Sequence, residues 1–322
     1  MTESLYASID LGGTKVACAF GTAQGEVVLE RTVPTASHEG PLAVLARIAE
    51  LVNGMATEVG AAPAAAGMGV PGLADLAQGM TRFLPNLPTQ WRDVPVCGEL
   101  APRIGCPVYL LNDVRMATLG ELTYGHGRGG PRTMVFLALG TGVGGGVAIE
   151  GKLRLGPLGA AGELGHQTVV PDGPLCGCGN RGCVETFASG PAISAQGVWL
   201  MNSGRAPELH RIVDGDAGRV TPREMAAAAA AGDDSVRDAI VRAADYLGIS
   251  IANLIVALHP DMVVLGGGVA QIGDLLFDTV RATVKRRVRM FPPDDIAIVP
   301  SQLGTRAGML GGLALAAKGG AV

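Results

Sequence analysis

The 322-residue sequence predicts an α/β fold made of two similar lobes that face a central cleft. The main observation is a pattern that occurs twice, first from residue 5 and again from about residue 133. In each case two strands surround a glycine-rich turn, and helices follow. The chain is long enough for two domains, each with its own core. Its 49 glycines are clustered, which indicates backbone that comes close to a ligand rather than a flexible linker.

Hydrophobic spacing and turn residues predict the individual elements. In the first half they are strands 5–9, 15–20 and 26–32, helix 41–59, strands 66–70 and 107–111, and helix 114–124. In the second half they are strands 133–139 and 143–149, helices 191–201, 222–231 and 235–259, strand 262–265, helix 274–289, strand 296–299 and a helix from residue 306. We expect a small N-terminal lobe, residues 1–112, completed by the helix 306–322, and a large lobe, residues 113–305.

The composition excludes several classes of protein. The net charge is −4 and no block of Lys or Arg stands out, which argues against nucleic-acid and acidic-membrane partners. The N-terminus has no basic start and no apolar run, so we expect no signal peptide. Apolar stretches such as 134–139 are far shorter than the roughly 20 residues of a membrane helix. We therefore expect a cytoplasmic protein, whose six cysteines are not a disulfide framework.

A glycine pair joins the first two predicted strands. Such a pair lets backbone N–H groups approach phosphate oxygens closely. Thr14 can add a hydroxyl donor, and Asp10 at the end of the strand can hold Mg²⁺ through water. A Gly-Gly hairpin is also a common simple turn, so this pattern alone leaves both interpretations open. The candidate phosphate-binding residues here are Asp10, Gly12, Gly13, Thr14 and Lys15.

A second glycine-rich turn, residues 139–146, repeats this chemistry after a later strand. It contains a G-x-G-x-x-G pattern, but a dinucleotide site needs a helix to follow, and residues 147–149 read as strand. A near match to a Walker motif ends at Leu153, where Ser or Thr is required. We therefore reject both motifs and keep the turn as a phosphate-binding candidate. Its residues are Gly140, Thr141, Gly142 and Gly144.

A third glycine group, Gly266, Gly267 and Gly268, lies between a predicted strand and a helix. These glycines can pack against an adenine ring, or they can simply end a buried strand. Together with the two turns and the segment 303–308, they resemble the phosphate, adenosine and connecting segments of the actin–hexokinase–Hsp70 superfamily. This resemblance implies two actin-like (ribonuclease H-like) lobes around a cleft that binds ATP with Mg²⁺.

Asn112 and Asp113 lie where strand 107–111 meets the next helix. Ligands of doubly wound folds bind at such strand ends. Transfer of a phosphoryl group to an alcohol needs a carboxylate that accepts the hydroxyl proton, and Asp113 is the candidate base. An Asp at this position is equally suited to cap the helix, which is the structural alternative.

The residues between 162 and 185 point to a metal. One histidine and three cysteines within this stretch match a closed tetrahedral zinc site, which leaves no position open for catalysis. The glycines between them allow the loop 166–183 to fold tightly around an ion. Free thiols are the alternative. The candidate zinc ligands are His166, Cys176, Cys178 and Cys183.

The motifs G-E-x-G-H at 162–166 and C-x-C-x₄-C-x-E at 176–185 resemble those of the ROK family (repressors, open reading frames and sugar kinases). The resemblance spans residue 9 to about residue 312 and is closest to ATP-dependent glucokinases and N-acetylmannosamine kinases of bacteria. It implies a homodimer or tetramer, Mg-ATP, a structural zinc on the four ligands above, and Asp113 as base. The sugar contacts that it implies are Asn86, Asn112, Asp113, Glu163, His166 and Glu185.

The residue types agree with this role, since carboxylates and amides bind vicinal hydroxyls. Asn86, however, is flanked by Pro85 and Pro88 and is also typical of a simple turn. The expected reaction is transfer of the ATP γ-phosphoryl to a sugar hydroxyl, most simply the C6 hydroxyl of glucose or a related hexose. Amino sugars and cyclitols are alternative substrates. A sugar-sensing regulator, which needs a DNA-binding segment ahead of Asp10, and an inactive sugar-binding module are alternative functions.

Arg115 departs from the family pattern, which often has Asn there, and His126 and Arg128 have no assigned role. A cation near a helix N-terminus is unfavourable and indicates a specific partner. One hypothesis is an ion pair with a carboxylate of the other lobe or of a dimer partner. The other is that Arg115 reaches the sugar pocket and restricts the substrates that fit.

Overall fold

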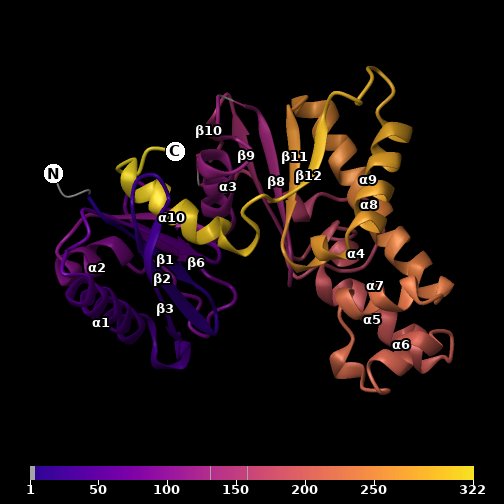
Figure 1. Cartoon of the computed structure of the whole chain (residues 1–322), viewed down its shortest axis with the longest axis horizontal. Coiled ribbons are helices and arrows are strands. Elements are labelled where there is room, and N and C mark those ends of the chain that lie inside the picture. Colours follow the sequence, from indigo (N-terminus) through magenta and orange to yellow (C-terminus); the bar gives the residue numbers. More distant parts are fainter. Residues whose placement is uncertain (1–3, 131, 158) are drawn as a thin grey trace. The chain divides into compact units, whose positions relative to one another are not determined.

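The computed structural model describes residues 4–130, 132–157 and 159–322. The chain forms two compact α/β units (Figure 1), each considered by itself. The first unit consists of Met1–Pro131, Gly146–Gly162 and Ser301–Val322, and the second of Arg132–Gly145 and Glu163–Pro300. Residues 113–130 and 146–162 thus cluster with the first unit, whereas the lobes expected from the sequence place them in the large lobe.

The first unit is built on a five-stranded sheet in the order β3-β2-β1-β4-β7. Strands β1, β2 and β3 form an antiparallel meander, and β4 and β7 continue the sheet in parallel with β1. Parallel strands end at the same edge, so the ends of β1, β4 and β7 lie together. The bounds are β1 Tyr6–Leu11, β2 Lys15–Gly21, β3 Val27–Pro34, β4 Ala66–Val70 and β7 Val108–Asn112, with a separate ribbon of β5 Leu73–Asp75 and β6 Met80–Phe83.

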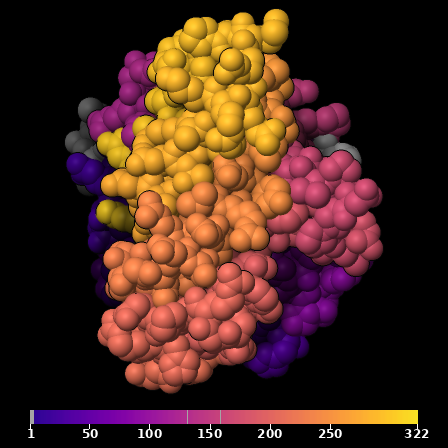
Figure 2. Space-filling model, turned by 90° about the vertical axis from the view of Figure 1, so that its right-hand side faces the viewer, coloured from indigo at the N-terminus to yellow at the C-terminus, as the bar shows by residue number. Residues whose placement is uncertain are grey.

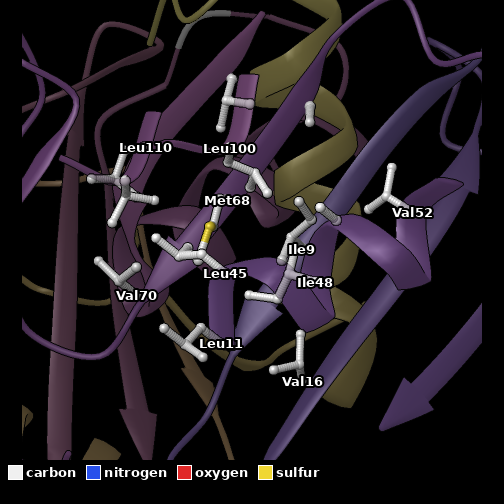
Figure 3. Packing of buried hydrophobic residues seen from close by; sticks show 14 of the residues in the cluster. Ile9, Leu11, Val16, Leu45, Ile48, Val52, Met68, Val70, Leu100 and Leu110 are labelled. Carbon is white, nitrogen blue, oxygen red and sulfur yellow. The ribbon is translucent and has the colours of Figure 1, made fainter. Parts of the chain in front are cut away.

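One face of this sheet packs on α1 (Pro41–Val59) and α2 (Val96–Ile104). Apolar side chains of α1 recur three to four residues apart, which gives the helix one buried face. In Figure 3, Leu45 and Ile48 of this face lie against Ile9 of β1 and Met68 of β4. Alternate residues of β1 point the other way, because side chains alternate across a strand. The opposite face, which includes Ser8 and Asp10, is therefore left to other helices.

Those helices are α10 (Ala307–Ala317) and α3 (Asp113–Tyr124). They approach each other and the sheet so closely that glycine is required at the contacts. A Cβ added to Gly67 would lie 2.2 Å from the carbonyl oxygen of Gly312, and one on Gly120 would lie 2.2 Å from that of Ala307. The buried carboxylate of Glu121 accepts hydrogen bonds from Ser301 Oγ (2.8 Å) and from the Gln302 N–H (2.9 Å). These contacts fix α3 on the segment that leads into α10.

The second sheet has the order β10-β9-β8-β11-β12, with β8, β11 and β12 parallel. Its strands are β8 Met134–Leu139, β9 Val143–Ile149, β10 Lys152–Leu153, β11 Met262–Gly266 and β12 Ala297–Pro300. The far half of β9 and all of β10 cluster with the first unit. The helices of the second unit are α4 Glu185–Ala188, α5 Gly190–Asn202, α6 Pro207–Ile212, α7 Pro222–Ala230, α8 Asp234–Leu258 and α9 Asp274–Arg287. The stretch from α5 to α9, salmon to yellow, covers much of the face seen in Figure 2.

The helix α8 is long and apolar enough to cross a membrane by length and composition alone. Charged residues separate its apolar ones, so its sequence does not read as one continuous apolar stretch. In the structure 61% of the apolar window is buried, and at Gly248 the helix lies against Thr283 of α9. The core helix of a soluble protein has the same properties, so α8 is weak evidence for a membrane span.

Candidate active site and metal centre

The first glycine-rich turn connects β1 to β2 and is exposed at residues 13–15. The Gly12 N–H donates to the Lys15 carbonyl (2.9 Å), and a Cβ on Gly12 would lie 2.9 Å from that oxygen. Thr35 braces the turn, since its hydroxyl donates to the Gly12 carbonyl (2.7 Å) and its N–H to the Thr14 carbonyl (2.9 Å). The turn is therefore held rigidly with its tip open, as phosphate binding requires.

Asp10 lies at the base of this turn, near the start of α10. A Cβ on Gly308 would lie 3.7 Å from Asp10 Oδ2. Burial raises the pKa of Asp10, and the positive charge of Lys15 partly opposes this. A half-buried carboxylate is stabilised in its charged form by a nearby cation. Asp10 thus fits the predicted role of holding Mg²⁺.

The loop that carries Asn86 reaches the same turn. A Cβ on Gly13 would lie 3.4 Å from the Asn86 carbonyl oxygen, and the Asn86 side chain is exposed. Leu84 and Leu87 on either side are buried and anchor the loop in the core. The structure therefore brings Asn86 next to the first phosphate turn, and its contact with sugar stays a prediction.

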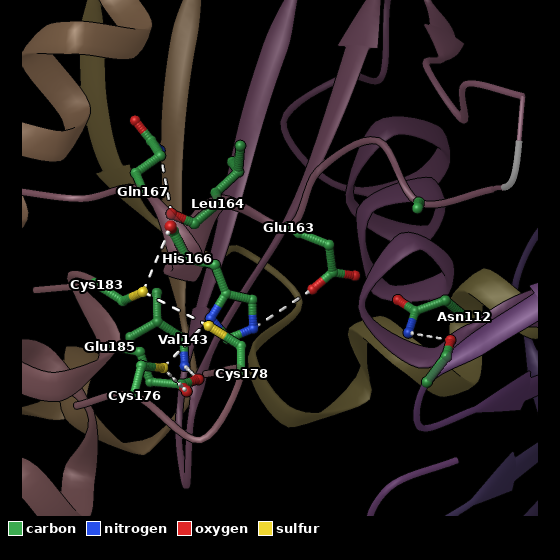
Figure 4. A network of polar contacts seen from close by, with 12 residues as sticks. Asn112, Val143, Glu163, Leu164, His166, Gln167, Cys176, Cys178, Cys183 and Glu185 are labelled. Atoms are coloured by element: carbon green, nitrogen blue, oxygen red, sulfur yellow. Dashed lines mark hydrogen bonds and ion pairs between the residues drawn. The ribbon is translucent and has the colours of Figure 1, made fainter. Parts of the chain in front are cut away.

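Asn112, rather than Asp113, is the N-cap of α3. Its Oδ1 accepts from the N–H groups of Val114 (3.0 Å) and Arg115 (3.2 Å), and its Nδ2 donates to the Gly72 carbonyl (3.1 Å) (Figure 4). The side chain of Asn112 is therefore engaged in structural bonds, and a direct contact with sugar remains a prediction. Asp113 follows in the first turn at the end of β7, where a catalytic carboxylate is expected.

Arg115 is buried, with 2% of the residue exposed. Its Nε donates to the Ala161 carbonyl (3.1 Å), Nη2 to the Ala160 carbonyl (3.2 Å) and Nη1 to Asn112 Oδ1 (3.0 Å). These three acceptors are two backbone carbonyl groups and one side-chain amide oxygen. The ion pair and the contact with the sugar pocket stay predictions. His126 lies near Glu121, with its Nε2 4.0 Å from Oε1.

In the second unit the structure brings two of the predicted ATP segments together. A Cβ on Gly267, whose φ is +86°, would lie 2.4 Å from the carbonyl oxygen of Leu139. The third glycine group therefore packs directly on the strand that leads into the second turn. The Gly140 carbonyl accepts from the N–H of Gly190 in the first turn of α5 (2.8 Å). The turn thus lies at a helix N-terminus, where phosphate groups are favoured.

A cavity of about 760 Å³ lies beside Ile272, which follows the third glycine group in the chain. It lies beside α7, α8, α9 and the 3-10 helix η4 (Gly268–Ile272). Its wall contains several small alanines and a few charged side chains. The lining includes Ala226, Ala229 and Ala230 of α7, Arg237 of α8, and Ile272 and Asp274.

The four predicted metal ligands form one cluster in the second unit (Figure 4). Their ligand atoms all lie within 4.8 Å of one another. His166 Nδ1 is 3.6 Å from Cys176 Sγ, and Cys178 Sγ is 3.8 Å from Cys183 Sγ. Sulfur atoms bound to zinc at about 2.3 Å in a tetrahedron are about 3.8 Å apart, whereas a disulfide bond is about 2.05 Å long. The residues therefore fit a Cys₃His metal site.

Backbone bonds shape the loop around this cluster. The Cys176 N–H donates to the Asn180 carbonyl (2.7 Å) and the Gly179 N–H to the Cys176 carbonyl (2.9 Å). Gly182 has φ +67°, and a Cβ there would lie 1.6 Å from the Val170 carbonyl oxygen. The Asn180 N–H lowers the pKa of the Cys178 thiol, while burial raises the pKa of Cys176 to about 12. The predicted tight fold of the glycine-containing loop is thus present.

The predicted sugar ligands of this unit surround the cluster. His166 turns Nδ1 to the cysteines and Nε2 toward Glu163, whose Oε2 is 3.9 Å away. Its two nitrogens can therefore serve the metal and the sugar separately. Glu185 Oε2 accepts from the Val143 N–H (2.9 Å), and Oε1 lies 3.6 Å from Cys176 Sγ. Glu185 thus connects the metal loop to the second phosphate turn.

Some of these functional contacts carry no signal in the sequence. Thr35 follows β3 and gives no hint that it braces a turn 20 residues earlier, and the contacts of Arg115 with Ala160 and Ala161 span 45 and 46 residues. The start of α5 is different. Ser189-Gly190-Pro191 is a typical helix start, and Ser189 Oγ accepts from the Ala192 N–H (3.4 Å). The sequence could therefore have predicted this helix start as a candidate neighbour of the second turn.

Known proteins resemble this chain over nearly its whole length. A glucokinase from Streptomyces coelicolor is 35% identical over 317 residues, which cover 97% of each chain. A xylose repressor from Caldicellulosiruptor bescii is 30% identical over 310 residues, 95% of this chain and 76% of the repressor. The crystal structure of a ROK family glucokinase from Streptomyces griseus, in complex with glucose and AMPPNP, is 33% identical, with a TM-score of 0.83 over 98% of this chain and 100% of that one.

These similarities confirm the predicted α/β fold of the actin–hexokinase–Hsp70 type. The family model named "ROK family" matches residues 6–319. The matched range contains both glycine-rich turns, the third glycine group and the four clustered metal ligands. This chain therefore belongs to the ROK family.

Proposed function

We propose that this protein is an ATP-dependent sugar kinase that phosphorylates the C6 hydroxyl of glucose or a related hexose. The observation that carries the proposal is the similarity, over 98% of this chain and 100% of the other, to a glucokinase whose structure holds glucose and an ATP analogue. The curated glucokinase from Streptomyces coelicolor covers the chain to the same extent. The candidate residues described above supply the chemistry that this reaction needs.

In the proposed reaction Asp113 accepts the proton of the sugar hydroxyl as its oxygen bonds to the γ-phosphorus of ATP. The bond from this phosphorus to the β,γ-bridging oxygen breaks, and ADP leaves. Asn86, Glu163, His166 and Glu185 orient the sugar through its other hydroxyls. The backbone of residues 12–14 and 140–142 holds the phosphate groups. Closure of the two predicted lobes, residues 1–112 with 306–322 and residues 113–305, excludes water.

Two metal ions belong to this proposal. Mg²⁺, held through Asp10, would neutralise charge on the phosphate groups when bound with ATP. Zn²⁺ would bind His166, Cys176, Cys178 and Cys183 and have a structural role, since four protein ligands leave no open position. We also propose a cytoplasmic homodimer or tetramer, which light scattering of the purified protein would distinguish from a monomer.

A coupled assay of ADP release over about ten sugars tests the proposed function. We expect Mg-ATP-dependent turnover with glucose or a close relative as the best substrate, ranked by kcat/KM. Turnover with an amino sugar or cyclitol alone would correct the substrate and keep the reaction. Sugar binding without transfer to any substrate would instead favour a sensor, a possibility that the similarity to a xylose repressor raises.

We further propose that the adenine ring of ATP occupies the 760 Å³ cavity beside Ile272, which follows the third glycine group in the chain. A larger side chain at the half-buried Ala229 would fill part of this cavity, so Ala229→Phe should raise the KM for ATP at least about tenfold, or about 1.4 kcal/mol. Its KM for sugar should change less than about twofold. Ala227→Phe is the control, because Ala227 is exposed on the same helix and is not part of the cavity lining. Equal effects of both variants on the KM for ATP would contradict this placement.

A further inference from the structure

The guanidinium of Arg115 binds two consecutive carbonyl groups from one side. Nε donates to Ala161 (3.1 Å) and Nη2 to Ala160 (3.2 Å), which uses one edge of the planar group. A buried charge is unfavourable unless its donors are satisfied, and an Arg side chain has five N–H donors in a fixed geometry. This planar arrangement explains how one side chain can hold two successive peptide units in a fixed geometry, which a Lys ammonium does not provide.

The same guanidinium also contacts the start of α3. Nη1 donates to Asn112 Oδ1 (3.0 Å), the atom that caps the helix by accepting from the N–H groups of Val114 and Arg115. Asn112 in turn is tied to the turn after β4 through its bond to Gly72. Arg115 therefore joins residues 160–161 to the residue immediately before Asp113. All of these contacts lie within the first unit.

The segment bound in this way has little regular structure of its own. Residues 154–157 and 159–162 lie outside helices and strands. Within them, the Arg154 N–H donates to the Val147 carbonyl (2.8 Å) and the Ala161 N–H to the Leu155 carbonyl (2.9 Å). The segment ends at Gly162, which has φ +102°, and the next residue is Glu163. A backbone without a helix or strand depends on such side-chain bonds for its position.

We infer that Arg115 is a positioning residue for sugar phosphorylation. Arg115 holds residues 160–161 at the N-terminus of the helix that carries Asp113. Glu163 follows two residues later in the chain, so its starting point is fixed as well. Arg115 acts through the backbone and through Asn112, and it need not contact the sugar. This inference rests on the proposed function. It assigns Arg115 to the positioning of sugar-binding groups rather than of ATP-binding groups.

The test compares Arg115→Met and Arg115→Lys with the wild-type protein. We expect Arg115→Met to raise the KM for glucose at least about tenfold, because a misplaced binding group loses affinity, while the KM for ATP changes less than about twofold. Arg115→Lys keeps the charge but loses the planar group that bonds two carbonyl groups and Asn112 in a fixed geometry. Its KM for glucose should therefore lie between those of the wild-type protein and Arg115→Met. Calorimetric titration with glucose should show the same order of affinities.

Arg281→Met is the matched control. Arg281 also donates to a backbone carbonyl, that of Ile298 in β12 (2.8 Å), but it belongs to α9, outside the proposed sugar site. It should lower the melting temperature and leave both KM values unchanged. If Arg115→Met and Arg115→Lys also lower the melting temperature and leave both KM values unchanged, Arg115 is only structural and the inference is wrong. If Arg115→Met does not fold, Arg115→Lys alone decides between the two outcomes. Absence of turnover in the wild-type protein would instead contradict the proposed function.

Discussion

Asp113→Asn should lower kcat at least about 10²-fold, the lower range for loss of a general base. The structure gives a reason to expect normal folding, because the cap of α3 is Asn112 and not Asp113. An Asn at position 113 also keeps an oxygen that can accept from the Val114 N–H, as Asp113 Oδ1 does at 2.8 Å. The melting temperature and the affinity for sugar should therefore stay close to wild type. Steady-state kinetics together with calorimetric titration of glucose measure both quantities.

Asp216→Asn provides the control for this change. Asp216 also accepts a hydrogen bond from the backbone, at the Gly218 N–H (2.8 Å), at the start of a short 3-10 helix outside the proposed site. It should leave kcat unchanged. Wild-type kcat in Asp113→Asn would show that Asp113 is not the base and would leave it as one more acidic residue in the first turn of a helix.

Cys178→Ser should remove most of the bound zinc and lower the melting temperature by at least about 4 °C. Cys178 is exposed, so the exchange of sulfur for oxygen removes a ligand without opening a hole in the core. Three remaining ligands hold zinc less well, and the binding energy of a structural metal contributes to folding. For a domain of 150–250 residues, about 1 kcal/mol corresponds to roughly 2–4 °C. Metal analysis by mass spectrometry and thermal unfolding give the two numbers.

Cys97→Ser is the matched cysteine control, because Cys97 is a partly buried free thiol outside the metal cluster. It should keep the full metal content. The loss of metal should also reduce activity, since His166 is part of the cluster and Glu185 contacts it through Cys176. A Cys178→Ser protein with wild-type zinc content and activity would refute the structural role of the metal.

The sequence predicted most elements because their patterns are strong and local. Helix α1 and strands β4 and β9 have the predicted bounds, and the Pro at the start of α1 and the Gly after it are typical helix limits. The sequence did not indicate α2, which contains Gly98 and Pro102, or the short α6. These are stabilised by burial of a few apolar side chains such as Leu100 and Leu209, and burial depends on the rest of the fold.

In the candidate site, too, local sequence patterns predicted some features, whereas others depend on the rest of the fold. The four metal ligands lie within 18 residues in sequence, so their spacing alone predicted the cluster that the structure brings together. The bonds of Arg115 to residues 160 and 161 were not predictable, because these acceptors are carbonyl groups of alanines, which any residue could supply. Likewise, the backbone conformation of one residue decides that Asn112 caps the helix and that Asp113 is left as the candidate base.

The most direct test of the central claim is the identity of the reaction product. Purified protein, Mg-ATP and glucose should be followed by ³¹P NMR. We expect the γ-phosphate signal of ATP to decrease while ADP and one sugar phosphate monoester increase in equal amounts, and Asp113→Asn should slow this conversion at least about 10²-fold. Release of inorganic phosphate without a sugar phosphate, or no consumption of ATP with any sugar of the panel, would contradict the assignment as a sugar kinase.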